Sequence, residues 1–214
     1  MGASDVIVIG AGHNGLVCAY YLAERGLKVT VLEARSVVGG AAVTEEFHPG
    51  FRNSTASYTV SLLNPKIIRD MGLYRHGLKV VLRKIDNFLP TTSGDYLLAG
   101  RGGLTKREIA RHSAADAENY DAYSTALSSV VGLLRKWILR APPNAGGGLS
   151  DLLALLKLGG GVGRLPIEDQ RHLVDFFTKS AADILERYFG HALVQALFGF
   201  DAVVGHYASP YAPG

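Results

Sequence analysis

Three glycines near the start of the chain have the spacing of a turn that binds phosphate groups. Gly10, Gly12 and Gly15 follow the β-branched run 6–9 and precede an Ala- and Leu-rich stretch. In such a turn the first glycine permits the tight exit from a strand, the second lets the backbone approach a diphosphate, and the third lets a helix lie close to the strand. Free N–H groups at the helix start then face the phosphates, where the helix dipole favours negative charge. The alternative is an ordinary βαβ turn without a ligand.

A carboxylate stands 18 residues beyond the last of these glycines. Glu33 ends a second predicted strand, 28–32, which completes a βαβ unit of about 30 residues with the first strand and the helix. Its side chain can accept hydrogen bonds from a ribose diol and would repel a 2′-phosphate. The glycine turn and this acid together predict a site for an adenine dinucleotide. They do not separate NAD from FAD.

A loop with two adjacent glycines, 34–40, comes directly after the acid. Gly39 and Gly40 allow backbone conformations that other residues resist. A flexible turn is one interpretation. The position of the loop next to the predicted ribose-binding acid favours a second contact with the dinucleotide.

Three strings in this region, GAGHNGL, YLAERG and EARSVVGG, resemble the FAD-binding N-terminus of the flavin amine oxidase and phytoene desaturase superfamily. The string at 12–17 is similar in particular to the phytoene-dehydrogenase-like branch. The resemblance is strong over 5–65 and looser afterwards. It implies that FAD is the cofactor, with the paired glycines along the diphosphate and the acid on the ribose. The residues that it assigns to the cofactor are Gly10, Gly12, His13, Asn14, Gly15, Glu33, Ala34, Arg35, Gly39 and Gly40.

The resemblance also implies an activity. An FAD-dependent oxidoreductase of this type removes two hydrogens across a C–C bond of an apolar substrate, or carries out a related redox step or isomerisation. The flavin accepts the hydride, so no catalytic residue is assigned. In the superfamily a later Gly-Asp segment returns beside the flavin, and this sequence does not contain it. The chain is therefore interpreted as the N-terminal portion of such an enzyme. The alternatives are one half of a split flavoenzyme, whose second subunit supplies the C-terminal half, and a non-catalytic nucleotide-binding or membrane-associating module.

The elements around this site predict an α/β fold with two domains. Residues 1–73 are expected to form the N-terminal segment of a Rossmann-like FAD-binding domain, three-layered with a parallel central sheet. Residues 74–214 are expected to form a partial, mostly helical substrate domain. By resemblance the stretch 41–60 passes beneath the flavin, and a polar surface loop is the alternative. Its possible neighbours of the flavin are Asn53, Ser57 and Tyr58.

Shorter elements follow from local patterns. Pro65 and Gly72 delimit a short helix over 66–71. Strands are predicted over 78–83, 87–89 and 96–98, with a turn at 93–95 between the last two.

Helices are predicted over most of 105–200, each with recognisable ends. The first begins at a cap of Ser113 with Asp116 and ends before Pro142, the second covers 151–158 between Ser150 and the glycines 159–161, the third runs from Pro166 to Gly190, and the last covers about 192–198.

Composition narrows the class of protein. A net charge of +3 does not indicate a nucleic-acid binder. Cys18 is the only cysteine, so the chain has no internal disulfide, and it is expected to lie as a small apolar residue on the first helix. The start of the chain lacks a basic signal region, which predicts a cytoplasmic location. The seven histidines are scattered, so no metal site is expected. His206 is interpreted as structural or solvated, with contact to a substrate as the alternative.

One stretch permits two interpretations. Apolar residues at 133–138 and the leucines of 152–158 alternate with Arg135, Lys136, Arg140 and Lys157. Such a surface can rest on an anionic membrane as a peripheral contact. Burial in a core, with the basic residues solvated, is the interpretation that we favour.

Overall fold

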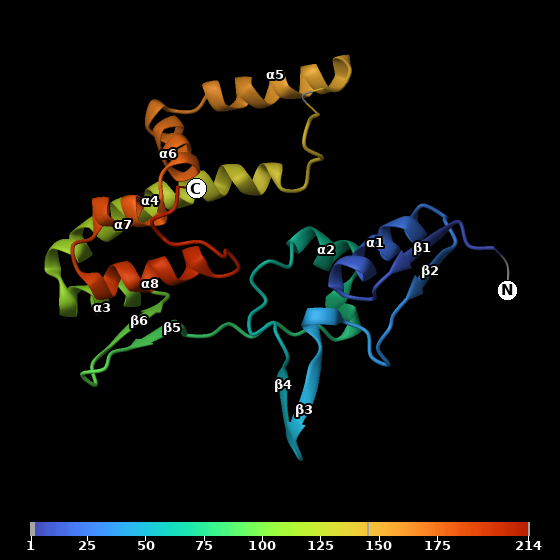
Figure 1. Cartoon of the computed structure of the whole chain (residues 1–214), viewed down its shortest axis with the longest axis horizontal. Coiled ribbons are helices and arrows are strands. Elements are labelled where there is room, and N and C mark those ends of the chain that lie inside the picture. Colours follow the sequence, from blue (N-terminus) through green and yellow to red (C-terminus); the bar gives the residue numbers. More distant parts are fainter. Residues whose placement is uncertain (1–2, 145, 214) are drawn as a thin grey trace. The chain divides into compact units, whose positions relative to one another are not determined.

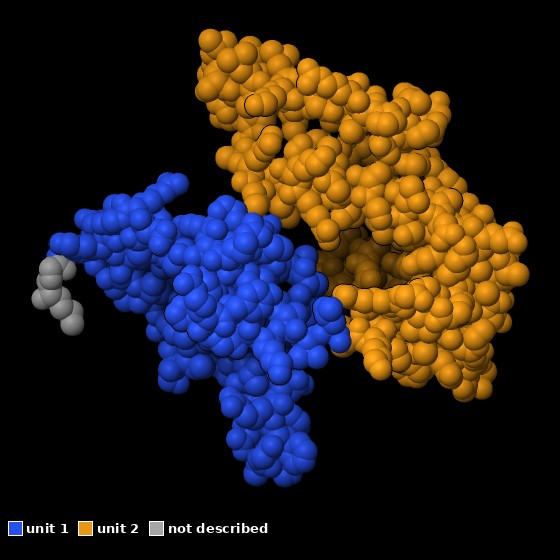
Figure 2. All heavy atoms as spheres, turned by 180° about the vertical axis from the view of Figure 1, so that it is seen from behind, with its two compact units in different colours: residues 1–82 blue, residues 83–214 orange. Residues whose placement is uncertain are grey.

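The computed structural model describes residues 3–144 and 146–213. Its contacts divide the chain into two compact units, Met1–Leu82 and Arg83–Gly214, which are coloured separately in Figure 2. The division comes later than the domain crossing predicted near Leu73. The reason is that the 3-10 turn η2 (Leu73–His76) continues the first unit, where the Leu78 N–H donates to the Leu73 carbonyl at 3.0 Å.

The first unit begins with the predicted βαβ arrangement. Strand β1 (Val6–Ile9), helix α1 (His13–Glu24) and strand β2 (Val29–Leu32) follow in order, and β1 pairs with β2 in parallel. Among the described residues this parallel sheet contains only two strands. The three-layered arrangement around a parallel central sheet that the sequence predicts is therefore not complete within this part of the chain.

A hairpin occupies part of the stretch 41–60, for which no strands are predicted. Strand β3 (Thr44–His48) pairs antiparallel with β4 (Phe51–Ser54), with a register shift between Glu46 and His48. Both strands are largely exposed. Their sequences therefore lack the alternation of apolar and polar residues that is typical of a half-buried strand.

Helix α2 (Pro65–Asp70) confirms the predicted short helix. The Asn64 side chain caps it by accepting the Lys66 N–H at 2.9 Å. Two tyrosines hold α1 to α2: Tyr20 donates its hydroxyl to the Asp70 carbonyl at 2.6 Å, and Tyr21 donates to the Asp70 carboxylate at 2.7 Å.

The second unit starts with an antiparallel hairpin, β5 (Ile85–Pro90) and β6 (Tyr96–Gly100), as predicted for 87–89 and 96–98. The strand predicted over 78–83 is wrong. That run is apolar and β-branched in part, but it finds no neighbouring strand and has no regular structure.

Six helices follow the hairpin in the described residues (Figure 1). They are α3 (Leu104–His112), α4 (Ala114–Trp137), α5 (Leu149–Gly163), α6 (Ile167–Thr178), α7 (Ala181–Tyr188) and α8 (Ala192–Val203). The predicted cap of α4 is confirmed, because the Ser113 hydroxyl accepts the Asp116 N–H at 3.1 Å.

Two of the predicted helices need correction. Helix α5 starts after Gly148 rather than at a Ser150 cap and continues through the glycines 159–161, which lie inside it. The single helix predicted from Pro166 to Gly190 is two helices, α6 and α7. Ser180 separates the two helices because it caps the start of α7. Its side chain and that of Asp183 form a reciprocal capping box.

The core of the second unit joins the hairpin to the helices. Its buried residues come from β6, α3, α4, α7 and α8 and the turn after α7: Leu97, Ile109, Ala117, Tyr123, Ile184, Leu185, Phe189, Val194 and Leu197. The Asp116 carboxylate links α4 to the turn after α7, accepting the N–H groups of Gly190 and His191 at 2.9 Å each. The leucines of α5 lie outside this core.

Candidate dinucleotide-binding site

The glycine turn connects β1 to α1 and is fixed by close backbone contact. Gly10 leaves the strand with its N–H donated to the Leu32 carbonyl of β2 at 2.7 Å. A Cβ atom added at Gly15 would lie 2.1 Å from the Gly10 carbonyl oxygen, far inside any real contact. Position 15 therefore accepts only glycine, and this is what lets α1 lie against the end of β1.

The paired glycines of the loop 34–40 lie directly on this turn. Gly39 forms a parallel bridge with Gly12 and donates its N–H to the Ala11 carbonyl at 2.7 Å. Gly40 has a φ of 56°, and a Cβ atom there would lie 2.9 Å from the Gly12 Cα. The structure thus brings together the two glycine motifs that the sequence singled out.

Gly12 differs from Gly15 and Gly40 because a side chain there would have room. Its backbone is extended, with φ −71° and ψ 171°. An added Cβ atom would meet only the Gly40 Cα, at an ordinary 3.8 Å. The fold therefore has room for a methyl group at position 12. That methyl group would, however, block a diphosphate that approaches the backbone.

Glu33 lies at the carboxyl end of β2 and faces the glycine turn. Its two oxygens accept the N–H groups of Arg35 at 3.0 Å and of Ala11 at 2.7 Å. These bonds hold the pKa of the Glu33 carboxyl below its ordinary value, the Arg35 N–H contributing most. A carboxylate has about four lone-pair positions, so acceptor capacity remains for a ribose diol.

The Arg35 guanidinium forms an ion pair with Glu45 of β3. Its charge is therefore matched by the hairpin, a partner that the sequence did not reveal. Ala34 supplies a backbone N–H that also lowers the Glu33 pKa. Ala11 is buried at 2% exposed and uses both backbone groups, one toward Glu33 and one toward Gly39.

A cavity of about 660 Å³ opens beside the first turn of α1. His13 and Asn14 line it, together with Ser57 and the segment 59–63. Of the neighbours that the resemblance suggested for a flavin, only Ser57 is among the lining residues. Tyr58 is 73% exposed. A cavity of this size lies within the range of small-molecule sites.

Other residues considered in the sequence lie elsewhere. Cys18 lies on α1 as predicted, but it is exposed, so the prediction that it packs there as a small apolar residue is wrong. His206 lines a cavity of the second unit. Within 3–144 and 146–213, no three His, Cys, Asp or Glu side chains are grouped as metal ligands.

Comparison with known proteins agrees with this geometry. Residues 8–71 match the family described as "NAD(P)-binding Rossmann-like domain". Pyridine nucleotide-disulfide oxidoreductase domain-containing protein 2 of Rattus norvegicus is 35% identical over 230 residues, which cover 98% of this chain and 39% of that protein. A limonene dehydrogenase polypeptide of Castellaniella defragrans is 41% identical over 119 residues, covering 54% of this chain and 21% of that protein.

Among solved structures, putrescine oxidase bound to putrescine aligns with a TM-score of 0.54 and 19% identity, covering 97% of this chain and 38% of that one. The chain therefore has a Rossmann-like dinucleotide-binding domain in a mixed α/β fold of the flavin amine oxidase type. It spans about two fifths of the length of the rat relative. The phytoene-dehydrogenase-like branch remains a prediction from sequence.

Proposed function

We propose that this Rossmann-like domain binds FAD and forms the cofactor-holding part of a flavin-dependent oxidoreductase. One observation carries the proposal: Glu33 and the glycine turn face each other through the Ala11 N–H, with the paired glycines against the same turn. This arrangement supports a ribose acceptor and a diphosphate-binding helix start at the same end of the β1–β2 sheet.

Each group has a definite part in holding the cofactor. The first N–H groups of α1, at His13 and Asn14, have no partner within the helix and would face the diphosphate. Glu33 would accept the ribose hydroxyls, and Gly12 would leave room for the diphosphate. Bound FAD supplies the hydride-accepting ring, so the chain contributes position and charge. The paired glycines favour FAD over NAD by resemblance.

A Gly12→Ala variant tests the proposal without disturbing the fold. The new methyl group has room in the structure but fills the space that a diphosphate needs. We expect FAD affinity, measured by quenching of flavin fluorescence, to fall at least about tenfold, comparable to one lost charge-assisted hydrogen bond or more. Gly132→Ala on α4, where the added Cβ atom meets nothing within 4 Å, is the matched control.

Two results would contradict the assignment. If Gly12→Ala binds FAD as tightly as the parent chain does, the diphosphate does not bind at the glycine turn. Tighter binding of NAD⁺ than of FAD by the parent chain would assign the other dinucleotide. An apolar substrate and a phytoene-dehydrogenase-like reaction are part of the proposal by resemblance only, and they are tested by flavin reduction with candidate substrates.

A second function is proposed for α5, a peripheral contact with an anionic membrane. Four leucines at helical spacing are 52% to 72% exposed: Leu149, Leu152, Leu153 and Leu156. The expected burial in a core is therefore wrong for Leu152, Leu153 and Leu156. Lys157 and Arg164 follow the stripe and carry charge complementary to acidic lipid headgroups. Among the described residues, none of the helices combines the length and apolar character needed to cross a bilayer.

Vesicle co-sedimentation tests this contact. Vesicles containing phosphatidylserine are expected to carry down the parent chain, and a Leu153→Ser, Leu156→Ser variant is expected to remain largely in the supernatant. Val174→Ser on α6 changes another exposed apolar residue, 59% exposed, and serves as the control. If the leucine variant sediments as much as the Val174→Ser variant, α5 does not make the membrane contact.

A further inference from the structure

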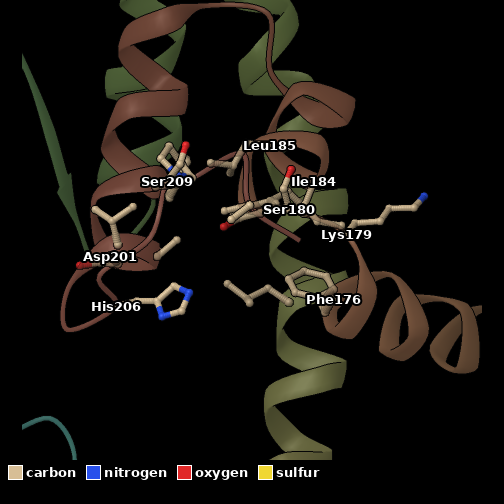
Figure 3. A pocket seen from close by; sticks show the side chains of 16 residues that line it. Phe176, Lys179, Ser180, Ile184, Leu185, Asp201, His206 and Ser209 are labelled. Atoms are coloured by element: carbon tan, nitrogen blue, oxygen red, sulfur yellow. The ribbon is translucent and has the colours of Figure 1, made fainter. Parts of the chain in front are cut away.

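The second unit contains a cavity of about 410 Å³ that the cofactor site does not use. Helices α4, α6, α7 and α8 and the segment 206–212 surround it (Figure 3). Its walls are mainly apolar and include Leu127, Phe176, Ile184 and Phe198. The volume is that of a small-molecule site.

The C-terminal segment forms one wall and is fixed to α7 by hydrogen bonds. The Ala182 N–H donates to the Pro210 carbonyl at 2.9 Å, and Ser180 forms an antiparallel bridge with Pro213. The cavity is therefore enclosed on this side by a segment with defined partners. Figure 3 shows the His206 ring pointing from this segment in the direction of Phe176.

Tyr123 places an unpaired hydroxyl at this cavity. The residue lines the cavity and is only 7% exposed, yet its hydroxyl has no hydrogen-bond partner within 3–144 and 146–213. The hydroxyl oxygen is not among the fully buried, unpaired side-chain atoms of the described residues, so it remains accessible to a ligand that enters the cavity. Burial, followed by smaller contributions from Tyr120 and then the Asp201 carboxylate, raises the pKa of Tyr123 to about 12. The hydroxyl is thus protonated at neutral pH and able to donate or accept.

The charges at the cavity favour a ligand that donates hydrogen bonds. Lys179 is paired with Asp175 at 3.0 Å, and Figure 3 shows its side chain directed away from the other labelled residues. Asp201 also lines the cavity and has no ion pair in the part of the chain that the structure describes. An anionic ligand would meet this carboxylate, whereas a donor group would be attracted to it.

We infer that this cavity binds an apolar molecule with a hydrogen-bond donor, a hydroxyl or an ammonium group, at one end. The apolar body lies against Phe176 and Ile184, and the donor group lies between Tyr123 and Asp201. The inference concerns the second unit alone, so it stands or falls separately from FAD binding.

Calorimetric titration of the full chain with three probes of equal length tests the inference. We expect 1-octanol and octylamine to bind saturably with one site, and octanoate to bind about threefold to fivefold more weakly because the exposed Asp201 carboxylate repels it. Whichever of 1-octanol and octylamine binds more tightly identifies the preferred donor group, hydroxyl or ammonium. Absence of saturable binding by both, or equal binding of octanoate, would overturn the inference.

Two matched pairs of variants locate the binding. Tyr123→Phe is expected to weaken binding by about threefold to tenfold, the effect of one hydrogen bond. Tyr120→Phe, on the same helix and stacked on Phe198, should leave it unchanged. Ala202→Leu fills this cavity and should abolish binding, whereas Ala196→Leu lies in a neighbouring cavity and should not.

Equal effects within either pair would overturn the inference. Thermal melting followed by circular dichroism establishes that each variant is folded. If Tyr123→Phe does not fold, the alanine pair decides alone. FAD titration of the same variants is expected to be unchanged, which separates this site from the cofactor site.

Discussion

At the scale of single residues, the clearest constraint is the missing side chain at position 15. Replacing Gly15 by alanine places a Cβ atom 2.1 Å from the Gly10 carbonyl oxygen. We expect a loss of about 1–3 kcal/mol in the free energy of unfolding, since α1 must move away from the strand end. Urea unfolding measures it, with Gly12→Ala as the tolerated substitution. An unchanged midpoint for Gly15→Ala would contradict the close contact.

Glu33 predicts a dependence of stability on pH. Its folded-state pKa lies below the ordinary value of about 4.3. The ionised carboxylate therefore contributes stability that is complete above that value and is lost as the pH falls through the lower, folded-state pKa. In Glu33→Gln this contribution is absent, so its melting temperature should fall less than that of the parent chain on acidification from about pH 6 to pH 3.

The control for this measurement is Glu118→Gln on α4, which removes a carboxylate from the second unit. Its melting temperature should follow that of the parent chain across the same range. If the Glu33→Gln and parent curves are parallel, the two backbone N–H groups do not stabilise the ionised acid.

Part of the site was predictable because glycine spacing and a single acid are local signals. Gly10, Gly12, Gly15 and Glu33 come together as the βαβ pattern requires. The Ala11 N–H and the ion pair of Arg35 with Glu45 were not predictable. The first is a backbone group without a sequence signature, and the second depends on a hairpin with no apolar alternation.

At the scale of elements, the boundary between α6 and α7 depends on one capping box. Ser180 accepts the Asp183 N–H at 3.0 Å, and the Asp183 carboxylate accepts the Ser180 N–H at 3.1 Å. Ser180→Ala should therefore cost about 1 kcal/mol in the free energy of unfolding. Ser150→Ala provides the matched control, since Ser150 lies inside α5 and caps nothing. Equal costs would contradict the assigned helix starts.

Helix α5 contains three consecutive glycines with free space around them. Added Cβ atoms at Gly159, Gly160 and Gly161 would meet nothing within 4 Å. Gly160→Ala should therefore stabilise the helix by about 0.5–1 kcal/mol, because glycine loses more backbone freedom than alanine on folding. Far-ultraviolet circular dichroism at rising temperature measures the gain. A loss of helix content would show that the glycine is needed.

Some local end signals predicted helix starts correctly, whereas some elements that need a distant partner were not predicted correctly. Pro65 and the Ser113 cap mark the starts of their helices in the sequence, and α2 and α4 begin there. The run 78–83 resembles a strand, but a strand requires a neighbour, and local alternation does not show whether one exists. The glycines 159–161 were predicted to end a helix. They lie inside α5 instead, because the cost of glycine to a helix is modest and not prohibitive.

At the scale of the whole molecule, two units are joined by an exposed segment without regular structure. Lys79, Arg83 and Lys84 lie in this segment. Brief trypsin treatment should therefore cut here first and yield two fragments that separate near position 83. Mass spectrometry of the products identifies the cuts. Initial cleavage within α4 or α8 would contradict the division into units.

One face of the β1–β2 sheet is apolar and exposed. Ile7 and Ile9 are 60% and 87% exposed, whereas Val8, on the opposite face, lies near α1 at Gly15. Ile9→Ser should change the free energy of unfolding by less than about 0.5 kcal/mol and reduce binding of a hydrophobic dye. Val8→Ser should be clearly destabilising.

Ala11 connects three segments of the candidate dinucleotide-binding site. Its N–H holds the acid of β2, and its carbonyl holds the loop with the paired glycines. A preorganised site of this kind spends little binding energy on ordering its own loops. Association of the dinucleotide should then occur in one kinetic phase, with a rate proportional to its concentration and no slower isomerisation afterwards.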